Sequence, residues 1–231
     1  MNNYIIDASR AINWDTTLPK IYEATFQTLQ MVFTTLLVGG ILGLVFGIIL
    51  WGTRKGNLIE NFVVYKILSL TIDIIRPIPF IIFITAIQPL TIGIMGTSIG
   101  TTAVIFPMTI FATVATARLV EQSLIQTDPG IIEAGLSMGA SRKRILFQLI
   151  LPEAICPLIL GYAFLLIAIF DMSAMAGTVG GGGLGNFAMV WGYQKFNPTL
   201  MWICVGIILV FVELTQIFAQ YLTKRIIHKR S

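Results

Sequence analysis

Charged side chains are scarce in this chain. Of its 231 residues only 11% are Asp, Glu, Lys or Arg, whereas 56% are hydrophobic, and the mean hydropathy is +0.86. Soluble domains carry about 25% charged residues. Two stretches, 24–53 and 77–117, contain no charged residue, and each exceeds the roughly 20 helical residues that cross a bilayer core. The composition excludes a soluble globular domain and predicts a polytopic membrane protein.

Groups that perform chemistry are equally few. The one histidine, His228, lies in a basic tail, and Cys156 and Cys204 fall inside apolar runs, where a thiol serves as a small packing residue. These residues predict no catalytic group, no metal site and no cofactor. The chain contains no G-x-x-x-x-G-K-[ST] segment, so it cannot hydrolyse ATP with a P-loop. Any energy that the protein uses must therefore come from a partner or from an ion gradient.

Long apolar runs predict an all-α fold in a single transmembrane domain, 1–231. Pro77 and Pro79 should kink or break the second of its helices, because proline donates no backbone hydrogen bond. Small residues four apart in the first helix let helix backbones approach closely; they are Gly39, Gly43 and Gly47. The five predicted spans are about 25–51, 58–87, 98–121, 151–178 and 200–223.

Lysine and arginine cluster between alternate spans and at the C-terminus. The clustered residues are Arg54, Lys55, Arg118, Arg142, Lys143, Arg144, Lys224, Arg225, Lys229 and Arg230. By the positive-inside rule these groups are cytoplasmic. We therefore expect an external N-terminus, a cytoplasmic C-terminus and a cytoplasmic loop at about 122–150. The segment "QPLTIGIMGT" and the segment after the fourth span, which has only Lys195, are expected to be external loops.

The cytoplasmic stretch 128–148, "DPGIIEAGLSMGASRKRILFQ", predicts two short helices. Asp128 is a favoured N-cap and Pro129 a favoured first helical residue. Gly139 can end the first helix in a left-handed conformation, and Ser141 can cap the second. One interpretation is an amphipathic pair at the membrane surface, its basic residues on anionic headgroups. Another is a docking face for a second protein. Three basic residues in one turn make no nucleic-acid surface.

Two motifs in and after this stretch resemble those of a known family, and the resemblance favours the docking face. "EAGLSMG" at 133–139 and "LILP" at 149–152 resemble the cytoplasmic loop of permease subunits of ATP-binding-cassette importers. Gly135 stands where that family usually has a second alanine, and Leu149 where it usually has isoleucine. The segments "RPIPFIIF", "GTSIG" and "SAMAGTVGGGGLGNFA" are similar to the permease subunit of methionine importers. The likeness runs from about residue 25 to residue 230.

The resemblance implies a type I importer permease fold with a cytoplasmic coupling helix. The residues it assigns to coupling with the ATPase are Glu133, Ala134, Gly135, Gly139 and Pro152. It further implies a homodimer of this chain, two copies of an ATPase subunit, and an external binding protein, often a lipoprotein. The expected function is import of methionine by alternating access across a bacterial plasma membrane. The alternatives are a permease for another amino acid or a quaternary amine, a secondary transporter or channel, and a membrane scaffold.

The fourth span leads into an external glycine-rich segment. "GGGGLG" matches G-x-G-x-x-G, but a dinucleotide site needs a preceding strand, so we expect a tight turn instead. The resemblance implies that this turn borders the external gate. The residues predicted along the substrate path are Asp171, Met172, Ser173, Met175, Gly177 and Gly182. Asp171 could equally lie at headgroup level, and Glu213 could pair with Arg118 or with a helix end.

Overall fold

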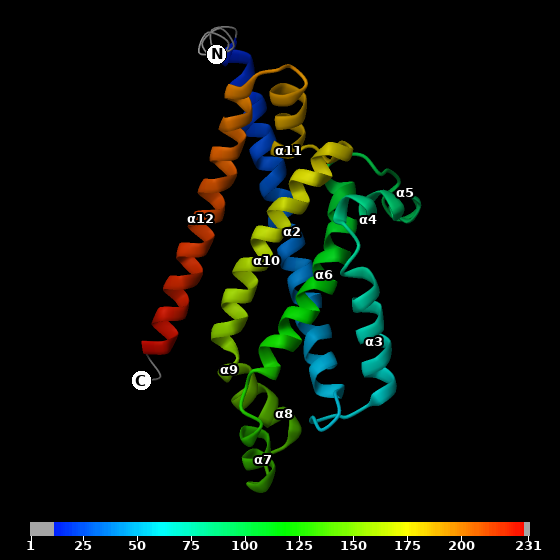
Figure 1. Ribbon diagram of the computed structural model, residues 1–231, viewed down its shortest axis with the longest axis vertical. Coiled ribbons are helices and arrows are strands. Elements are labelled where there is room, and N and C mark those ends of the chain that lie inside the picture. The colour runs from blue at the N-terminus through cyan, green and yellow to red at the C-terminus, as the bar shows by residue number, and fades with distance from the viewer. Residues whose placement is uncertain (1–11, 229–231) are drawn as a thin grey trace. The chain divides into compact units, whose positions relative to one another are not determined.

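The computed structural model describes residues 12–228, and most of them are helical (Figure 1). The long helices are α2 (Trp14–Thr53), α6 (Thr101–Ile125), α10 (Ile155–Ala176) and α12 (Pro198–His228). The shorter helices are α3 (Phe62–Ile75), α4 (Phe80–Ala86), α5 (Gln88–Met95), α7 (Gly130–Ser137), α8 (Arg142–Ile145), α9 (Leu151–Glu153) and α11 (Gly183–Phe187). Wider π-type turns are η1 (Leu146–Ile150), η2 (Gly177–Gly181) and η3 (Ala188–Tyr193).

Four of the described helices are long and apolar enough to cross a membrane. They are Trp14–Thr53, Thr101–Ile125, Ile155–Gly181 and Pro198–Ile226, and they contain most of the first, third, fourth and fifth predicted spans. The pair α3 and α4 supplies a fifth if it counts as one broken span. The all-α membrane fold expected from the sequence is therefore confirmed. The predicted edges of each span within these helices, and the side on which each terminus lies, stay predictions. Lys229 and Arg230 of the basic tail lie outside the described residues.

The proline pair interrupts the second predicted span, as expected. Helix α3 ends at Ile75 and α4 begins at Phe80, with a bend of 104° between the two axes. Pro79 takes the N-cap position of α4. Its missing N–H costs nothing there, because the first amides of a helix have no partner inside the helix.

Both segments predicted to be external loops contain helices, so the expectation of irregular loops is wrong, while their external side stays a prediction. Residues 88–95 form α5, with Pro89 in its first turn and Gly96 ending it in a left-handed conformation, φ 77°. Residues 183–193 form α11 and η3. Proline in the first turn of a helix and glycine just after its last residue are signals of a helix. The absence of basic residues, in contrast, gives no information about secondary structure.

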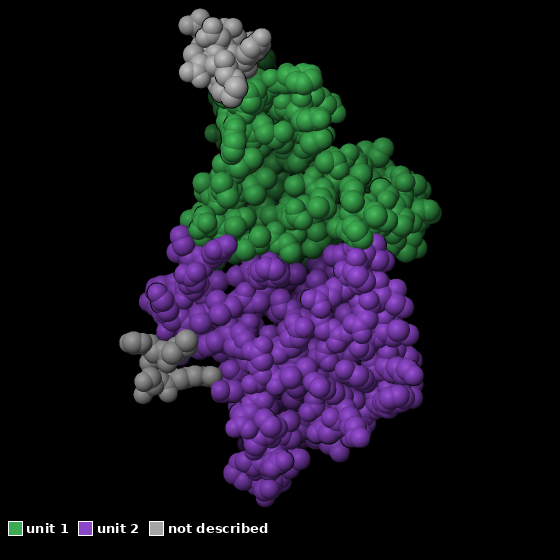
Figure 2. All heavy atoms as spheres, in the orientation of Figure 1, with its two compact units in different colours: residues 1–37, 79–110, 166–215 green, residues 38–78, 111–165, 216–231 purple. Residues whose placement is uncertain are grey.

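The described chain divides into two compact units, coloured separately in Figure 2. Unit 1 comprises residues 1–37, 79–110 and 166–215, and unit 2 comprises residues 38–78, 111–165 and 216–231. Each long helix contributes residues to both units.

Unit 1 has a core between the ends of two long helices and α11. Ile21 and Ala24 of α2 pack with Leu184 and Phe187 of α11 and with Leu200 of α12. Cys204 is buried in the same cluster, which confirms its predicted role as a small packing residue. Burial of an aliphatic side chain contributes about 1.5–3 kcal/mol, so this cluster fixes the segment that follows α10.

Unit 2 has a core beneath the stretch 128–148 that the sequence singled out. Trp51 at the end of α2 packs with Val120 and Leu124 of α6, with Ile145 of the stretch and with Ile150 just after it. The stretch is therefore part of a packed core and not a free loop.

Helices α2 and α6 approach closely in unit 2 because glycines of α2 face α6. A Cβ on Gly47 would lie 2.6 Å from the carbonyl oxygen of Ala117 and 2.6 Å from Cβ of Val120. A Cβ on Gly43 would collide with Thr116. The close approach expected from this spacing is confirmed at both positions.

We expect Gly47→Leu to reduce the free energy of unfolding by about 1–3 kcal/mol, the usual cost of overpacking a filled contact. Detergent-solubilised protein titrated with SDS would measure this. Val45→Leu adds a methylene on an exposed face of the same helix, and we expect it to change stability by less than about 0.5 kcal/mol. Equal effects of the two substitutions would contradict the close α2–α6 contact.

Candidate coupling segment and gate segment

The coupling segment, residues 128–153, begins with a capped turn. Helix α7 starts at Gly130, one residue later than predicted, and the Gly130 N–H donates to the Asp128 carboxylate over 2.8 Å. The predicted N-cap residue therefore does accept a hydrogen bond at the helix start. A carboxylate there also interacts favourably with the helix dipole.

A left-handed glycine separates the two short helices. Gly139 has φ 73°, and the Ala140 N–H donates back to the Gly135 carbonyl over 3.0 Å. Ser141 then caps α8, where its hydroxyl accepts from the Arg144 N–H. The predicted sequence of helix, glycine break and capped helix is confirmed.

Gly135 explains how α7 is attached to the rest of unit 2. It is buried, and a Cβ at this position would lie 2.9 Å from Cγ1 of Ile145 and 3.3 Å from Cδ1 of Leu149. Helix α7 therefore rests with its glycine face on α8 and η1. Alanine would fit only if these side chains moved by a few tenths of an ångström, so glycine at this motif position brings α7 closer to its support.

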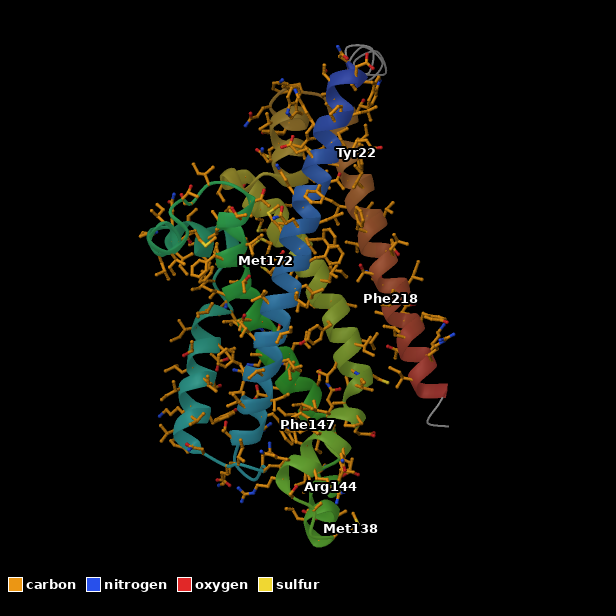
Figure 3. The ribbon with its side chains drawn as sticks, turned by 180° about the vertical axis from the view of Figure 1, so that it is seen from behind. Tyr22, Met138, Arg144, Phe147, Met172 and Phe218 are labelled. Atoms are coloured by element: carbon orange, nitrogen blue, oxygen red, sulfur yellow. The ribbon has the colours of Figure 1, made fainter. Side chains whose placement is uncertain are left out.

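The opposite face of α7 is exposed and largely apolar. Glu133 and Ala134 are exposed, and Met138 is 76% exposed. Figure 3 shows Met138, Arg144 and Phe147 on the coupling segment. Phe147 is 61% exposed. A single carboxylate among apolar side chains is a surface suited to protein contact.

The coupling segment continues into α10 with a small irregularity. After α8 come the wide turn η1 and the short helix α9, which contains Pro152. The Ala154 N–H donates to the Ile150 carbonyl over 2.9 Å, and the Leu158 N–H donates to the Ala154 carbonyl over 3.0 Å. These bonds carry the helical hydrogen-bond ladder past Pro152, so α8, η1, α9 and α10 form an almost continuous helix, on which α7 packs.

The residues predicted along the substrate path differ in exposure. Asp171 is exposed and Met175 is half-buried, whereas Met172 and Ser173 are buried within unit 1. The Ser173 hydroxyl donates to the Phe170 carbonyl over 2.7 Å. Gly177 is also buried, and Gly182 is half-buried, so Asp171 is the one fully exposed member of this set.

The gate segment, residues 177–184, folds back against α2. Its backbone leaves helical geometry at Val179 and Gly180, and Gly182 has φ 78° and ψ −158°. Gln27 accepts from the Gly183 N–H over 2.7 Å. The Thr28 hydroxyl accepts from the Leu184 N–H over 2.8 Å. The tight turn expected here is confirmed, and two polar side chains of α2 hold it.

Gly177 and its surroundings leave no room for a ligand in this turn. A Cβ on Gly177 would lie 2.5 Å from the Asn186 amide nitrogen. The segment follows helix α10 and not a strand, so it lacks the context of a dinucleotide site. Among the described residues no group of three or more His, Cys, Asp or Glu side chains is placed to hold a metal ion.

An ion cluster on α6 escaped sequence analysis. Arg118 forms ion pairs with Asp73 of α3 and Glu121 of its own helix, and also donates to the Ser69 hydroxyl over 3.1 Å. These partners lie on α3 and α6, and the two alternatives given for Glu213 stay predictions. The spacing of Arg118 and Glu121, three apart on a helix, was the one available signal.

The comparison with known families follows from this architecture. Residues 39–228 match the model of the family described as "Binding-protein-dependent transport system inner membrane component". The chain belongs to this family. Its members are transport components, and the family description places them in the inner membrane.

Individual permeases of this family resemble the chain over nearly its whole length. The "Probable D-methionine transport system permease protein MetI" of Vibrio cholerae is 40% identical, over 90% of this chain and 93% of its own. The "Methionine import system permease protein MetP" of Bacillus subtilis is 37% identical, over 92% and 96%. A solved chain of the inward-facing MetNI methionine ABC transporter has 35% identity and a TM-score of 0.88, over 91% of this chain and 98% of its own. The type I permease fold expected from the resemblance is confirmed.

Proposed function

We propose that this permease is the membrane subunit of an ATP-driven importer that moves methionine into the cell. The names of relatives that share 40% and 37% of their residues over about nine tenths of the chain support methionine as the substrate. This chain has no P-loop, so a separate ATPase subunit must supply the energy of ATP hydrolysis. The exposed face of α7 supports this mechanism because it offers a surface on which that subunit can dock.

The proposed assembly contains two copies of this permease, two ATPase subunits and an external binding protein. The solved relative is a chain of an ABC transporter, and this supports an ATPase partner. The positive-inside rule supports a cytoplasmic coupling segment, an external N-terminus and a cytoplasmic C-terminus.

The packing of α7 on α8 and η1 couples movement of the ATPase subunits to movement of the permease helices. ATP binding closes the ATPase subunits and moves α7, which is fixed through Gly135 to α8 and η1. The near-continuous helix past Pro152 passes this movement to α10, which ends at the gate segment. The cavity between the two permease copies then opens outward, accepts methionine and opens inward after hydrolysis, as in alternating access by rigid-body movement. Asp171 and Met175 line the path beside the gate.

We expect Glu133→Arg to reduce ATP-driven methionine uptake at least about tenfold, because a reversed charge at a docking face costs more than about 1.4 kcal/mol. Labelled methionine uptake would be measured in cells that lack the native copy of this chain. Asp15→Arg reverses an exposed carboxylate in the first turn of α2 and should leave uptake within about twofold, since it changes only a surface charge.

Competition by unlabelled amino acids and quaternary amines in the same cells tests the substrate. Competition by methionine-like compounds alone supports the proposal. If the chain restored uptake of another solute but not of methionine, methionine would be wrong as the proposed substrate, and the proposal of an importer would still hold. Normal uptake by Glu133→Arg would contradict the docking role of α7.

A further inference from the structure

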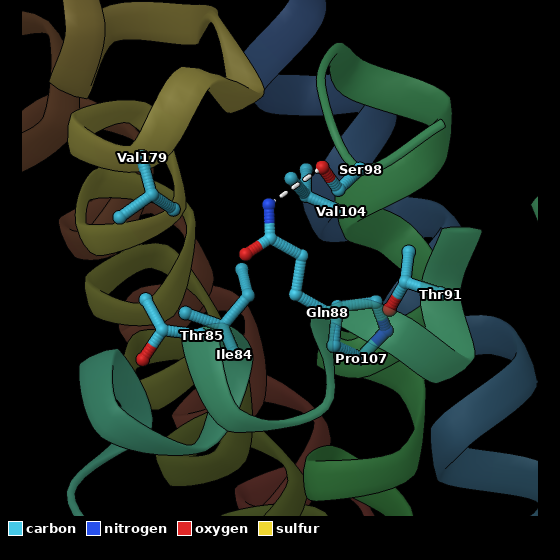
Figure 4. A pocket seen from close by; sticks show the side chains of 8 residues that line it. All are labelled: Ile84, Thr85, Gln88, Thr91, Ser98, Val104, Pro107 and Val179. Atoms are coloured by element: carbon cyan, nitrogen blue, oxygen red, sulfur yellow. Dashed lines mark hydrogen bonds between the residues drawn. The ribbon is translucent and has the colours of Figure 1, made fainter.

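A small cavity in unit 1 lies between α4, α5, the start of α6 and the gate segment. It has a volume of about 50 Å³ and is shown in Figure 4. The lining residues are Ile84, Thr85, Gln88, Thr91, Ser98, Val104, Pro107 and Val179. A cavity holds one water when its volume on this measure reaches about 10–15 Å³, so this one has room for a few non-hydrogen atoms. That is about the size of the amino and carboxyl end of an amino acid and not of a whole amino acid.

Several polar groups that line the cavity can form further hydrogen bonds. The Gln88 amide donates to the Ser98 hydroxyl over 2.9 Å, and its Oε1 points away from Ser98 into the cavity (Figure 4). Ser98 thereby serves as an acceptor, so its own O–H can still donate to a ligand. The Thr85 hydroxyl donates to the Ile82 carbonyl over 2.9 Å, and its oxygen can accept.

Apolar side chains lie among these polar groups, and no lining residue is charged. They are Ile84, Val104, Pro107 and Val179 of the gate segment. The gate segment is held to the start of α6, where the Gly100 N–H donates to the Gly180 carbonyl over 2.9 Å. The site therefore combines the acceptors Gln88 Oε1 and Thr85, the Ser98 donor and apolar side chains beside the gate, which suits a small solute with no net charge and an apolar side chain.

Broken helices are also where membrane transporters place their substrate sites, because unwound backbone is tolerated at membrane depth only where it lines a cavity or is buried in protein. We propose that this cavity binds the zwitterionic end of the transported amino acid. Gln88 Oε1 accepts from its ammonium group, the Ser98 hydroxyl donates to its carboxylate, and its side chain extends past Val179. This inference rests on the proposed import of an amino acid and adds residues that sequence analysis did not select.

Protection of an introduced thiol tests the site. Ser98→Cys is made in a chain that also carries Cys156→Ala and Cys204→Ala, assembled with its ATPase subunits in vesicles. A small methanethiosulfonate reagent labels the thiol with and without methionine, in the nucleotide-free and ATP-bound complexes. We expect labelling to slow about tenfold at a methionine concentration about ten times its dissociation constant. Gly93→Cys, on the exposed and open side of α5, should label at the same rate with and without methionine.

Gln88→Leu separates substrate binding from a merely structural contact. It should abolish protection of Ser98→Cys by methionine while labelling without methionine continues. Gln194→Leu makes the same change at an exposed position outside the cavity and should keep protection. Absence of protection in both nucleotide states of a Ser98→Cys complex that still imports methionine, or full protection after Gln88→Leu, would overturn the site.

Uptake of labelled methionine into vesicles is recorded separately for the wild-type and the Ser98→Cys complexes, because Ser98→Cys replaces the proposed hydroxyl donor. Uptake by the Ser98→Cys complex without protection of its thiol would refute the cavity site and leave the proposed function intact. Protection without uptake would support the cavity site and count against the proposed import of methionine.

Discussion

Arg118→Leu is expected to lower the free energy of unfolding by about 3–5 kcal/mol, the cost of removing one partner of a buried ion pair. The Glu121 side chain is only 2% exposed, and Arg118 neutralises it in the described structure. Without the guanidinium, a carboxylate would stay inside a membrane protein with no cation beside it. Asp73 contributes less, because its side chain is 58% exposed and water can solvate it.

An SDS titration of the purified protein measures this loss. Arg76→Leu removes an arginine near the end of the same α3 helix that carries Asp73, and we expect it to cost less than about 0.5 kcal/mol. The double variant Arg118→Leu, Glu121→Leu should recover most of the stability, since a buried pair replaced by apolar residues is often neutral. If the double variant were as unstable as the single one, an unpaired charge would not be the cause.

Features that depend on neighbouring residues could be predicted from the sequence. The break at Pro77 and Pro79, the left-handed Gly139 and the Ser141 cap each follow from the backbone preferences of one or two residues. The long apolar helices follow from composition alone. The location of the coupling segment followed from a motif, and its attachment through Gly135 required coordinates, because Ile145 and Leu149 lie ten or more residues away.

Features that depend on distant partners could not be predicted. Gln27 and Thr28 hold the gate segment from 156 residues away, and nothing in their local sequence marks them. The Gln88–Ser98 contact closes over ten residues, across a segment that was expected to be a loop. The distribution of lysine and arginine predicts the side of the membrane on which a segment lies. It carries no information about whether that segment is helical.

Gly182→Ala is expected to disrupt the gate segment and reduce methionine uptake at least about tenfold, since 1.4 kcal/mol suffices for that factor. The backbone of Gly182, φ 78° and ψ −158°, lies in a region that is essentially restricted to glycine, and other residues pay about 1–3 kcal/mol there. A Cβ would also lie 2.5 Å from Oε1 of Gln27. That oxygen accepts from the Gly183 N–H, so alanine displaces the bond that closes the turn.

Labelled methionine uptake and the amount of assembled complex would be measured together, because a local defect at the gate lowers the first and spares the second. Gly93→Ala is the control, since Gly93 lies in α5 with open space around it, and alanine there favours the helix by up to about 1 kcal/mol. Gln27→Leu removes only the acceptor of the Gly183 N–H. Its methionine uptake should lie between that of Gly182→Ala and that of Gly93→Ala, because an unpaired buried N–H costs about 1–3 kcal/mol. If Gly182→Ala imported methionine as well as Gly93→Ala does, the transport cycle would not require this turn. In that case the bonds from α2 would stabilise unit 1 without controlling the gate.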